Sequence, residues 1–195
     1  MARALSEEKR LLIMQQSKEL FARNGFGATS VADIAKTCEL PVGSIYTYFT
    51  NKEEIVRAIV DEGWDDLRAR LKQALGDAAT PEEQMSLLVN RFLPQLLADA
   101  DLITILLSEA VEHTRLQEKA AELVALFDAI LAPIAAARPG LEGFSRAHLE
   151  AALLVYFLGA LDATRLSSVS DLSVTADDVL AFLRLTVRNT LGLSI

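Results

Sequence analysis

Apolar residues recur three or four positions apart along nearly the whole chain, and no segment alternates apolar and polar residues for long enough to predict a β-strand. We therefore expect an all-α protein. Helix starts and stops divide the pattern into about nine helices. The expected helices are Ser6–Asn24, a short helix capped by Ser30, Val42–Phe49, Asn51–Leu75, Pro81–Leu96, Leu102–His113, Leu116–Ile134, Ser145–Leu166 and Thr175–Leu191.

The boundaries of these helices depend on residues with known capping or breaking effects. Ser30 and Asp33 have the spacing of a capping box, and Pro81 suits the first position of a helix because it has no N–H to satisfy. Gly25 tolerates the left-handed conformation that ends many helices. The serine-rich segment 167–173 is expected to be a loop.

The segment from Ser30 to Lys52 predicts two short helices joined by a tight turn, Cys38–Pro41. Helices this short are not stable alone, so their apolar side chains must pack together. The residues spaced to do so are Ile34, Ala35, Leu40, Ile45 and Phe49. The other residues of the second short helix then lie wholly or partly on its outer face: Val42, Gly43, Ser44, Tyr46, Thr47 and Tyr48.

This outer face suits the major groove of duplex DNA. Gly43 allows the backbone to approach the duplex closely, and Val42 can touch a thymine methyl group. Ser44 and Thr47 offer short hydroxyls that can bond to base edges. The segment therefore predicts a helix-turn-helix module that binds DNA.

Phosphate contacts are expected at the edges of the same face. Tyr46 and Tyr48 can donate to phosphates, and Lys52 offers an ammonium beside the amides that begin the next helix. Ser30 or Thr29 can hold a phosphate at the start of the preceding helix. The alternative is that the tyrosines belong to the core and the hydroxyls only cap helices.

The stretch Leu20–Ile55 resembles the DNA-binding region of the TetR family of bacterial transcriptional regulators. The residues that carry the resemblance are Leu20, Phe21, Gly25, Phe26, Thr29, Ile34, Ala35, Gly43, Ile45, Tyr46, Tyr48, Phe49 and Lys52. The resemblance implies a helix-turn-helix domain over residues 1–52 and a helical ligand-binding and dimerisation domain over residues 53–195. It also implies that the outer-face residues and Lys52 contact DNA.

Several residues depart from the family's pattern, among them Gln16 and Ser17, which replace a commoner pair of alanines in the first helix. Glu39 stands where the family often has glycine, and Pro41 stands where a serine often caps the recognition helix, so that cap must be supplied differently. Val42 occupies a position that is frequently basic. We therefore expect fewer charged base contacts and more recognition of DNA shape.

Charge is unevenly distributed along the 195 residues, whose net charge is −8. Up to Lys52 the chain has seven basic and five acidic residues, a net of +2, and the remainder has 12 basic and 22 acidic residues, a net of −10. This asymmetry suggests a small basic DNA-binding part on a larger acidic body.

No apolar stretch looks like a secretory signal or a membrane span, so we expect a cytoplasmic protein without membrane association. A single cysteine, Cys38, excludes an internal disulfide and a cysteine-based zinc site.

Candidates for a small-molecule site are weaker. Glu109 and His113 are four residues apart and could share a metal, but no third ligand is evident, so we expect no metal and no cofactor. Neither they nor His148 belong to a catalytic constellation, which argues against an enzyme. The resemblance implies that a ligand cavity is lined by some of Trp64, Asn90, Phe92, Glu109, His113, Phe127 and Tyr156, each of which could equally be ordinary core.

The last two expected helices carry more apolar surface than one monomer needs, and small residues that allow close approach. A two-fold four-helix interface is therefore expected, although a core internal to the monomer remains possible. Its expected residues are Leu149, Ala152, Leu153, Tyr156, Phe157, Ala160, Leu180, Leu183, Val187 and Leu191.

Together these features predict a homodimeric regulator, more specifically a repressor, that binds a near-palindromic operator in double-stranded DNA. A largely apolar small molecule would release it from the operator. The alternative is an interaction protein of the same fold that uses DNA as a platform, or binds a protein partner, without an inducer.

Overall fold

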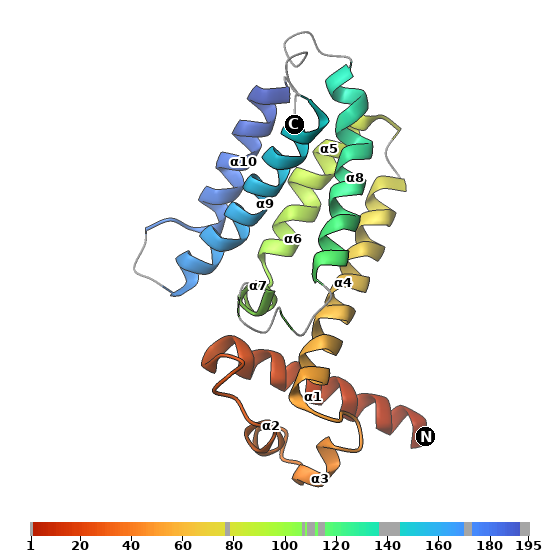
Figure 1. The fold of residues 1–195 in the computed structure, drawn as a ribbon, viewed down its shortest axis with the longest axis vertical. Coiled ribbons are helices and arrows are strands. Elements are labelled where there is room, and N and C mark those ends of the chain that lie inside the picture. The colour runs from red at the N-terminus through yellow and green to blue at the C-terminus, as the bar shows by residue number, and fades with distance from the viewer. Residues whose placement is uncertain are drawn as a thin grey trace. The chain divides into compact units, whose positions relative to one another are not determined.

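The protein is described here from a computed structural model that covers residues 2–76, 79–106, 108, 112, 116–136, 145–169 and 173–191. All regular structure in these ranges is helical (Figure 1), which confirms the all-α prediction. The helices are α1 (Ala2–Asn24), α2 (Val31–Thr37), α3 (Val42–Ile45), α4 (Lys52–Gly76), α5 (Pro81–Leu87), η1 (Leu88–Phe92), α6 (Leu93–Leu97), α7 (Ala100–Leu106), α8 (Leu116–Ala136), α9 (Arg146–Val169) and α10 (Ala176–Leu191).

The segments α5, η1 and α6 are continuous in the chain and correspond to one expected helix, with a π-helical stretch at η1. Such stretches are rare and often mark functional sites.

Several expected boundaries are wrong: among them, α1 begins at Ala2 rather than Ser6, and α7 ends at Leu106 rather than His113. The helix α3 ends at Ile45 and continues as turns, in which the Phe49 N–H still donates to the Ile45 carbonyl at 3.0 Å. The helix α9 runs to Val169, so the start of the expected loop is helical. The reason is local: the Ser167 hydroxyl donates to the Thr164 carbonyl at 2.8 Å, so its polar group is satisfied inside the helix.

The chain forms two compact units. Residues 1–65 and 101–116 make up the first unit, and residues 66–100 and 117–195 make up the second. The boundary between the compact units therefore lies within α4, after residue 65. The expected boundary between a DNA-binding domain and a ligand-binding domain, at residues 52 and 53, stays a prediction.

The first unit has one apolar core. Its buried residues come from five helices and three connecting segments: Ile13, Met14, Leu20, Phe21, Phe26, Ile34, Ala35, Cys38, Ile45, Phe49, Ile55, Val56, Ile59, Val60, Leu102 and Ile105. Leu102 and Ile105 show that α7 belongs to this core, although it lies some forty residues further along the chain than Val60. Gly63 allows this packing, because a Cβ there would lie 3.0 Å from the Leu102 Cδ2 atom.

The second unit packs its helices around buried leucine, isoleucine and aromatic side chains. The helix α10 packs along α9 and against η1 and α6, and α6 also contacts α9. Met85, Leu88, Phe92 and Leu96 are buried on the α5–α6 segment, and Leu161 is buried on α9. None of the helices in the described parts of the chain is long and apolar enough to cross a membrane.

A serine in the core of the first unit offers a test of the packing. Ser17 is fully buried and its hydroxyl has no hydrogen-bond partner within the described residues. A buried hydroxyl without a partner costs free energy, so Ser17→Ala is expected to raise the free energy of unfolding by about 1 kcal/mol in urea denaturation.

Ser30→Ala is the contrasting variant, because it removes an exposed hydroxyl that caps α2. It is expected to lower the free energy of unfolding by about 1 kcal/mol. A Ser17→Ala protein less stable than the wild type would contradict this account of the core.

Candidate nucleic-acid interface

The start of α2 is fixed by the expected capping box. The Asp33 N–H donates to the Ser30 hydroxyl oxygen at 3.2 Å, and the Ser30 N–H donates to the Asp33 carboxylate at 2.9 Å. The Ser30 hydroxyl also donates to this carboxylate. These bonds from Ser30 hold the pKa of Asp33 below its usual value. The capping box is therefore confirmed, and Ser30 lies exposed at the edge of the module.

The turn between α2 and α3 is built by backbone bonds. The Leu40 N–H donates to the Ala35 carbonyl at 2.9 Å, and Glu39 adopts the left-handed conformation with φ 54°. Pro41 precedes α3 without a side-chain cap, and its carbonyl accepts the Ser44 N–H at 2.8 Å. The helix α3 therefore begins without a side-chain cap, and the Pro41 carbonyl accepts its first backbone bond.

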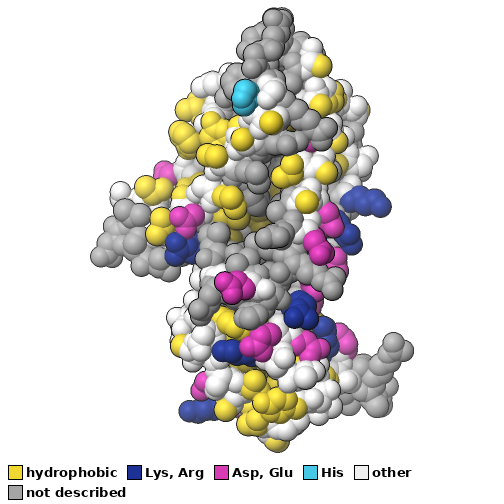
Figure 2. Space-filling model, viewed as in Figure 1, with side chains coloured by type: hydrophobic (Ala, Val, Ile, Leu, Met, Phe, Trp, Pro, Cys, Tyr) yellow, Lys and Arg dark blue, Asp and Glu magenta, His cyan; other side chains and the backbone are white. Residues whose placement is uncertain are grey.

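The helix α3 is anchored on one side and open on the other. Ile45 and Phe49 are buried in the core of the first unit, whereas the exposed fractions of Val42 and Tyr46 are 43% and 55%. Gly43 and Thr47 are exposed, and Ser44 and Tyr48 are half-buried. All six residues of the expected outer face therefore keep accessible surface. Figure 2 shows apolar side chains gathered at the end of the molecule where α3 lies in Figure 1.

The exposed face of α3 carries no charged side chain. Thr47 donates its hydroxyl to the Gly43 carbonyl at 3.3 Å, which tightens the turn that follows α3. A Cβ on Gly43 would meet nothing within 4 Å, and its φ is not positive. Within the described residues, nothing in the fold therefore requires a glycine at this position.

Two of the expected phosphate contacts are occupied within the protein. Thr29 is 2% exposed, and its hydroxyl donates to the Gly25 carbonyl at 2.8 Å. Its expected role as a side-chain phosphate ligand is therefore corrected, because burial removes the hydroxyl from the surface. The Lys52 ammonium donates to the carbonyls of Phe26, Gly27 and Thr29 at 2.8, 3.4 and 3.1 Å.

Cys38 is the cysteine at the end of α2. It is free and buried, and burial raises the pKa of its thiol. Within the described residues no group of three or more His, Cys, Asp or Glu side chains is placed to hold a metal.

The expected ligand-pocket residues are distributed over both units, and their role stays a prediction. Trp64 is half-buried on α4 in the first unit, and Phe92 is buried in the second. Asn90 is exposed and its amide donates to the Ser86 hydroxyl at 3.3 Å, so it does not line an enclosed cavity. Tyr156 lies on an open groove. Glu109, His113 and the side chain of Phe127 lie outside the described residues.

The groove lies between α9 and α10 and has a volume of about 350 Å³. Its lining is almost entirely apolar and includes the small residues Gly159, Ala160 and Ala163. Beside it, the exposed fractions of Val155, Phe182 and Leu185 are 69%, 61% and 47%. Figure 2 shows hydrophobic side chains over the region where α9 and α10 lie in Figure 1. We call the exposed apolar residues Val155, Tyr156, Leu158, Phe182 and Leu185 the α9–α10 face.

The residues expected at a dimer interface divide into three groups. Ala160, Leu180 and Leu183 are buried within the chain, and Ala160 and Leu183 line the groove, so their place at an interface stays a prediction. Ala152 and Val187 are half-buried, and Tyr156 is exposed. The side chains of Leu149, Leu153, Phe157 and Leu191 lie outside the described residues.

Sequence reasoning missed Val155, Leu158 and Phe182, which are the most exposed apolar residues of these helices. Helical spacing gave no signal for Phe182, which lies three residues after buried Val179 and next to buried Leu183. Both sides of α10 carry apolar residues, so spacing alone does not say which side faces outward.

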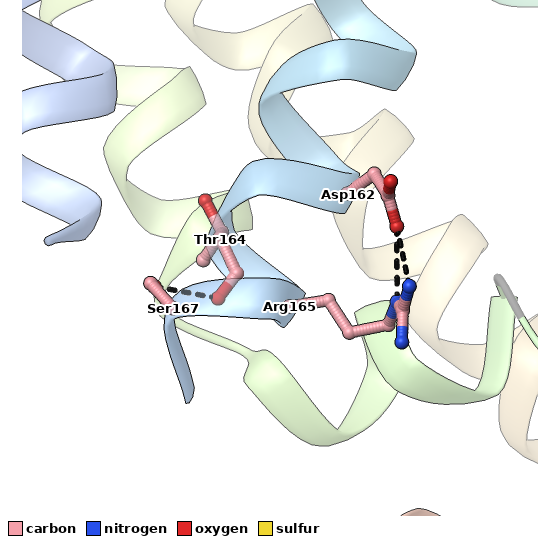
Figure 3. Close-up of polar contacts among 4 residues, drawn as sticks. All are labelled: Asp162, Thr164, Arg165 and Ser167. Carbon is pink, nitrogen blue, oxygen red and sulfur yellow. Dashed lines mark hydrogen bonds and ion pairs between the residues drawn. The ribbon is translucent and has the colours of Figure 1, made fainter. Parts of the chain in front are cut away.

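Polar groups also lie along α9 (Figure 3). The Arg165 guanidinium donates twice to the Asp162 carboxylate, at 3.0 and 2.7 Å. Thr164 is 4% exposed and its hydroxyl lacks a partner within the described residues, as does the buried Nε of Arg184 on α10.

Residues 13–59 match the family model described as bacterial regulatory proteins, tetR family. The fatty acid metabolism regulator protein of Bacillus subtilis is 30% identical over 94 residues, 48% of this chain and 48% of that protein. The transcriptional repressor KstR2 of Mycolicibacterium smegmatis is 34% identical over 74 residues, 38% of this chain and 36% of that protein. The chain thus spans less than half the length of these relatives.

The structural comparison extends over nearly the whole chain. The structure of FadR from Bacillus subtilis in complex with stearoyl-CoA is 22% identical, covers 95% of this chain and 98% of its own, and has a TM-score of 0.72. By their names, the first relative is a regulator of fatty acid metabolism and KstR2 is a transcriptional repressor. Residues 13–59 therefore match the TetR family of bacterial regulatory proteins, and the fold of the chain is similar to that of the FadR structure.

Proposed function

We propose that this protein is a homodimeric, cytoplasmic transcriptional repressor whose two α3 helices enter successive major grooves of a near-palindromic operator. The proposed DNA contacts are Ser30, Val42, Gly43, Ser44, Tyr46, Thr47 and Tyr48. The observation that carries the proposal is the open face of α3, where Tyr46 and Val42 are exposed and Gly43 has no internal reason to be glycine. Apolar side chains left outside in this way usually have a partner.

The chemistry of this face favours specific over general binding. Because α3 has no lysine or arginine, its own contacts release few counterions from DNA. Hydroxyls, a methyl-bearing side chain and close backbone approach then carry the base and shape contacts. Two copies held at the spacing of one helical turn are needed for useful affinity.

The second copy is proposed to dock on the α9–α10 face. Small residues in the groove allow two helix pairs to approach closely, and the exposed aromatic Phe182 can fill the partner's groove across a two-fold axis. A two-fold contact of two helix pairs is a four-helix bundle, in which this apolar surface is removed from water.

The effector is proposed to be a largely apolar small molecule, and a long-chain acyl-CoA is the first candidate. Its support is that a relative regulates fatty acid metabolism and that a protein of the same fold binds stearoyl-CoA. Within the second unit, the unpartnered Thr164 hydroxyl and Arg184 Nε are candidate partners for the polar part of such a ligand.

The DNA-binding proposal is tested by Gly43→Ala. The added Cβ meets nothing in the protein and alanine favours helix, so stability should be unchanged or up to about 1 kcal/mol higher. The same Cβ would lie where the DNA backbone or bases approach, so the dissociation constant for operator DNA should rise about tenfold or more. Gel retardation and urea denaturation measure the two effects.

Gly76→Ala is the matched control, because its Cβ also meets nothing within 4 Å and it lies outside the proposed contacts. It should leave DNA binding at the wild-type level. Wild-type operator affinity in Gly43→Ala would contradict the proposed approach of α3 to DNA.

The dimer is tested by Phe182→Arg. The exposed position tolerates arginine in the monomer, but a charge in an apolar interface is costly to bury, so sedimentation should show a shift from dimer to monomer at micromolar concentration. Operator binding should weaken with it. Leu11→Arg, at an apolar residue of the first unit that is 43% exposed, should remain dimeric. A dimeric Phe182→Arg protein would rule out the α9–α10 face as the interface.

The ligand is tested by adding stearoyl-CoA to a preformed protein–DNA complex. Release of DNA at micromolar concentrations is expected, because the acyl chain supplies the apolar surface that favours the non-binding state. Coenzyme A alone should have no effect. Binding to DNA that no acyl-CoA alters would remove this ligand class, and binding without sequence preference would favour an interaction protein instead.

A further inference from the structure

Lys52 occupies a cradle made by the loop between α1 and α2. Its ammonium lies 2.8 Å from the Phe26 carbonyl oxygen, 3.1 Å from that of Thr29 and 3.4 Å from that of Gly27. A lysine ammonium has three N–H donors, and three carbonyls accept them. The nitrogen also lies 4.5 Å from the centroid of the Phe26 ring, a favourable cation–π contact.

The loop that forms the cradle is itself well fixed. Gly25 takes the left-handed conformation with φ 84°, and its N–H donates to the Phe21 carbonyl at 3.0 Å. The Thr29 hydroxyl closes the loop on the Gly25 carbonyl. The Phe26 ring packs against Phe21 with their centroids 5.3 Å apart. These contacts within the loop help to hold the three carbonyls where they meet the lysine.

The other side of the contact is fixed as well. The Glu54 N–H donates to the Asn51 side-chain oxygen at 2.8 Å, and the Thr50 N–H donates to the Glu54 carboxylate at 2.6 Å. These bonds with Thr50 hold the pKa of Glu54 below its usual value. The first turn of α4 thus holds Lys52 opposite the loop.

The contact between Lys52 and the loop 25–29 restricts the segment that lies between them in the chain. Residues 30–51, which contain α2, the turn and α3, lie between Thr29 and Lys52. The cradle joins the two ends of this segment. A short helix-turn-helix whose ends are joined has fewer accessible orientations, so less of the binding free energy is needed to order it.

We propose that Lys52 is a positioning residue, whose ammonium ties the loop 25–29 to the start of α4 and thereby fixes the orientation of α3 for DNA. The proposal depends on the DNA-binding function proposed above. It differs from the phosphate contact that the family resemblance implies for Lys52, because a phosphate would have to draw the ammonium away from its three carbonyls.

The test uses the full-length protein and a duplex that the wild type selects from a random pool. Lys52→Met keeps the aliphatic stem but removes all three donors. Lys52→Arg keeps the charge, and with it any phosphate contact, but its planar five-donor fork does not match three carbonyls that converge on one nitrogen. DNA affinity is measured under conditions in which circular dichroism shows that each variant is fully folded.

Both variants should bind DNA about tenfold more weakly, because the competent orientation is populated less. The slope of log affinity against log salt should stay at the wild-type value, since no phosphate contact is lost. Amide hydrogen exchange of Gly27, Ala28 and Ser30 in the absence of DNA should accelerate. Lys36→Met, which removes the same charge from an exposed position on α2, should leave that exchange unchanged.

Two results would overturn the proposal. Fully folded Lys52→Met with wild-type affinity would show that the cradle does not orient α3. A salt slope reduced by about one in Lys52→Met, with wild-type binding by Lys52→Arg, would assign a phosphate contact instead. If Lys52→Met does not fold, the affinity of Lys52→Arg decides, since retained affinity contradicts the cradle. A wild type that selects no duplex would refute the DNA-binding function rather than the cradle.

Discussion

The helices α2 and α3 contain seven and four residues, and neither length is stable in water alone. Their structure depends on one apolar core, in which Ile34, Ile45 and Phe49 pack with residues of α1, α4 and α7. Because these three side chains are buried in the core, the residues on the opposite side of α3 face solvent. The exposed face proposed to bind DNA is thus a consequence of the packing beneath it.

Much of this arrangement could be predicted from the sequence. The inward positions of Ile34 and Ile45 follow from helical spacing, and the cap at Ser30 follows from Asp33 three residues later. Glu39 was recognised as standing where glycine is common, and its positive φ gives the reason, since the turn requires a left-handed residue whatever its side chain. Local rules suffice where neighbours in the chain determine the structure.

Tertiary contacts explain what the sequence could not predict. Thr29 and Lys52 look like surface phosphate ligands because both lie near helix starts, but carbonyls from the loop 25–29 satisfy them. On α10, spacing shows two apolar sides without showing that Leu180 and Leu183 pack inward while Phe182 faces out. The packing of α7 in the core of the first unit could not be predicted from the sequence around it, because the residues next to Leu102 resemble those next to many other leucines.

The place of α7 has a consequence for building hybrid regulators from this chain. A single junction after residue 65, which would join its DNA-binding part to a different sensor, would remove Leu102 and Ile105 from beneath the recognition helices. It would also remove the Leu102 side chain that packs against Gly63. A functional exchange would have to carry residues 101–116 along with residues 1–65, so the two parts of this protein are interleaved rather than sequential modules.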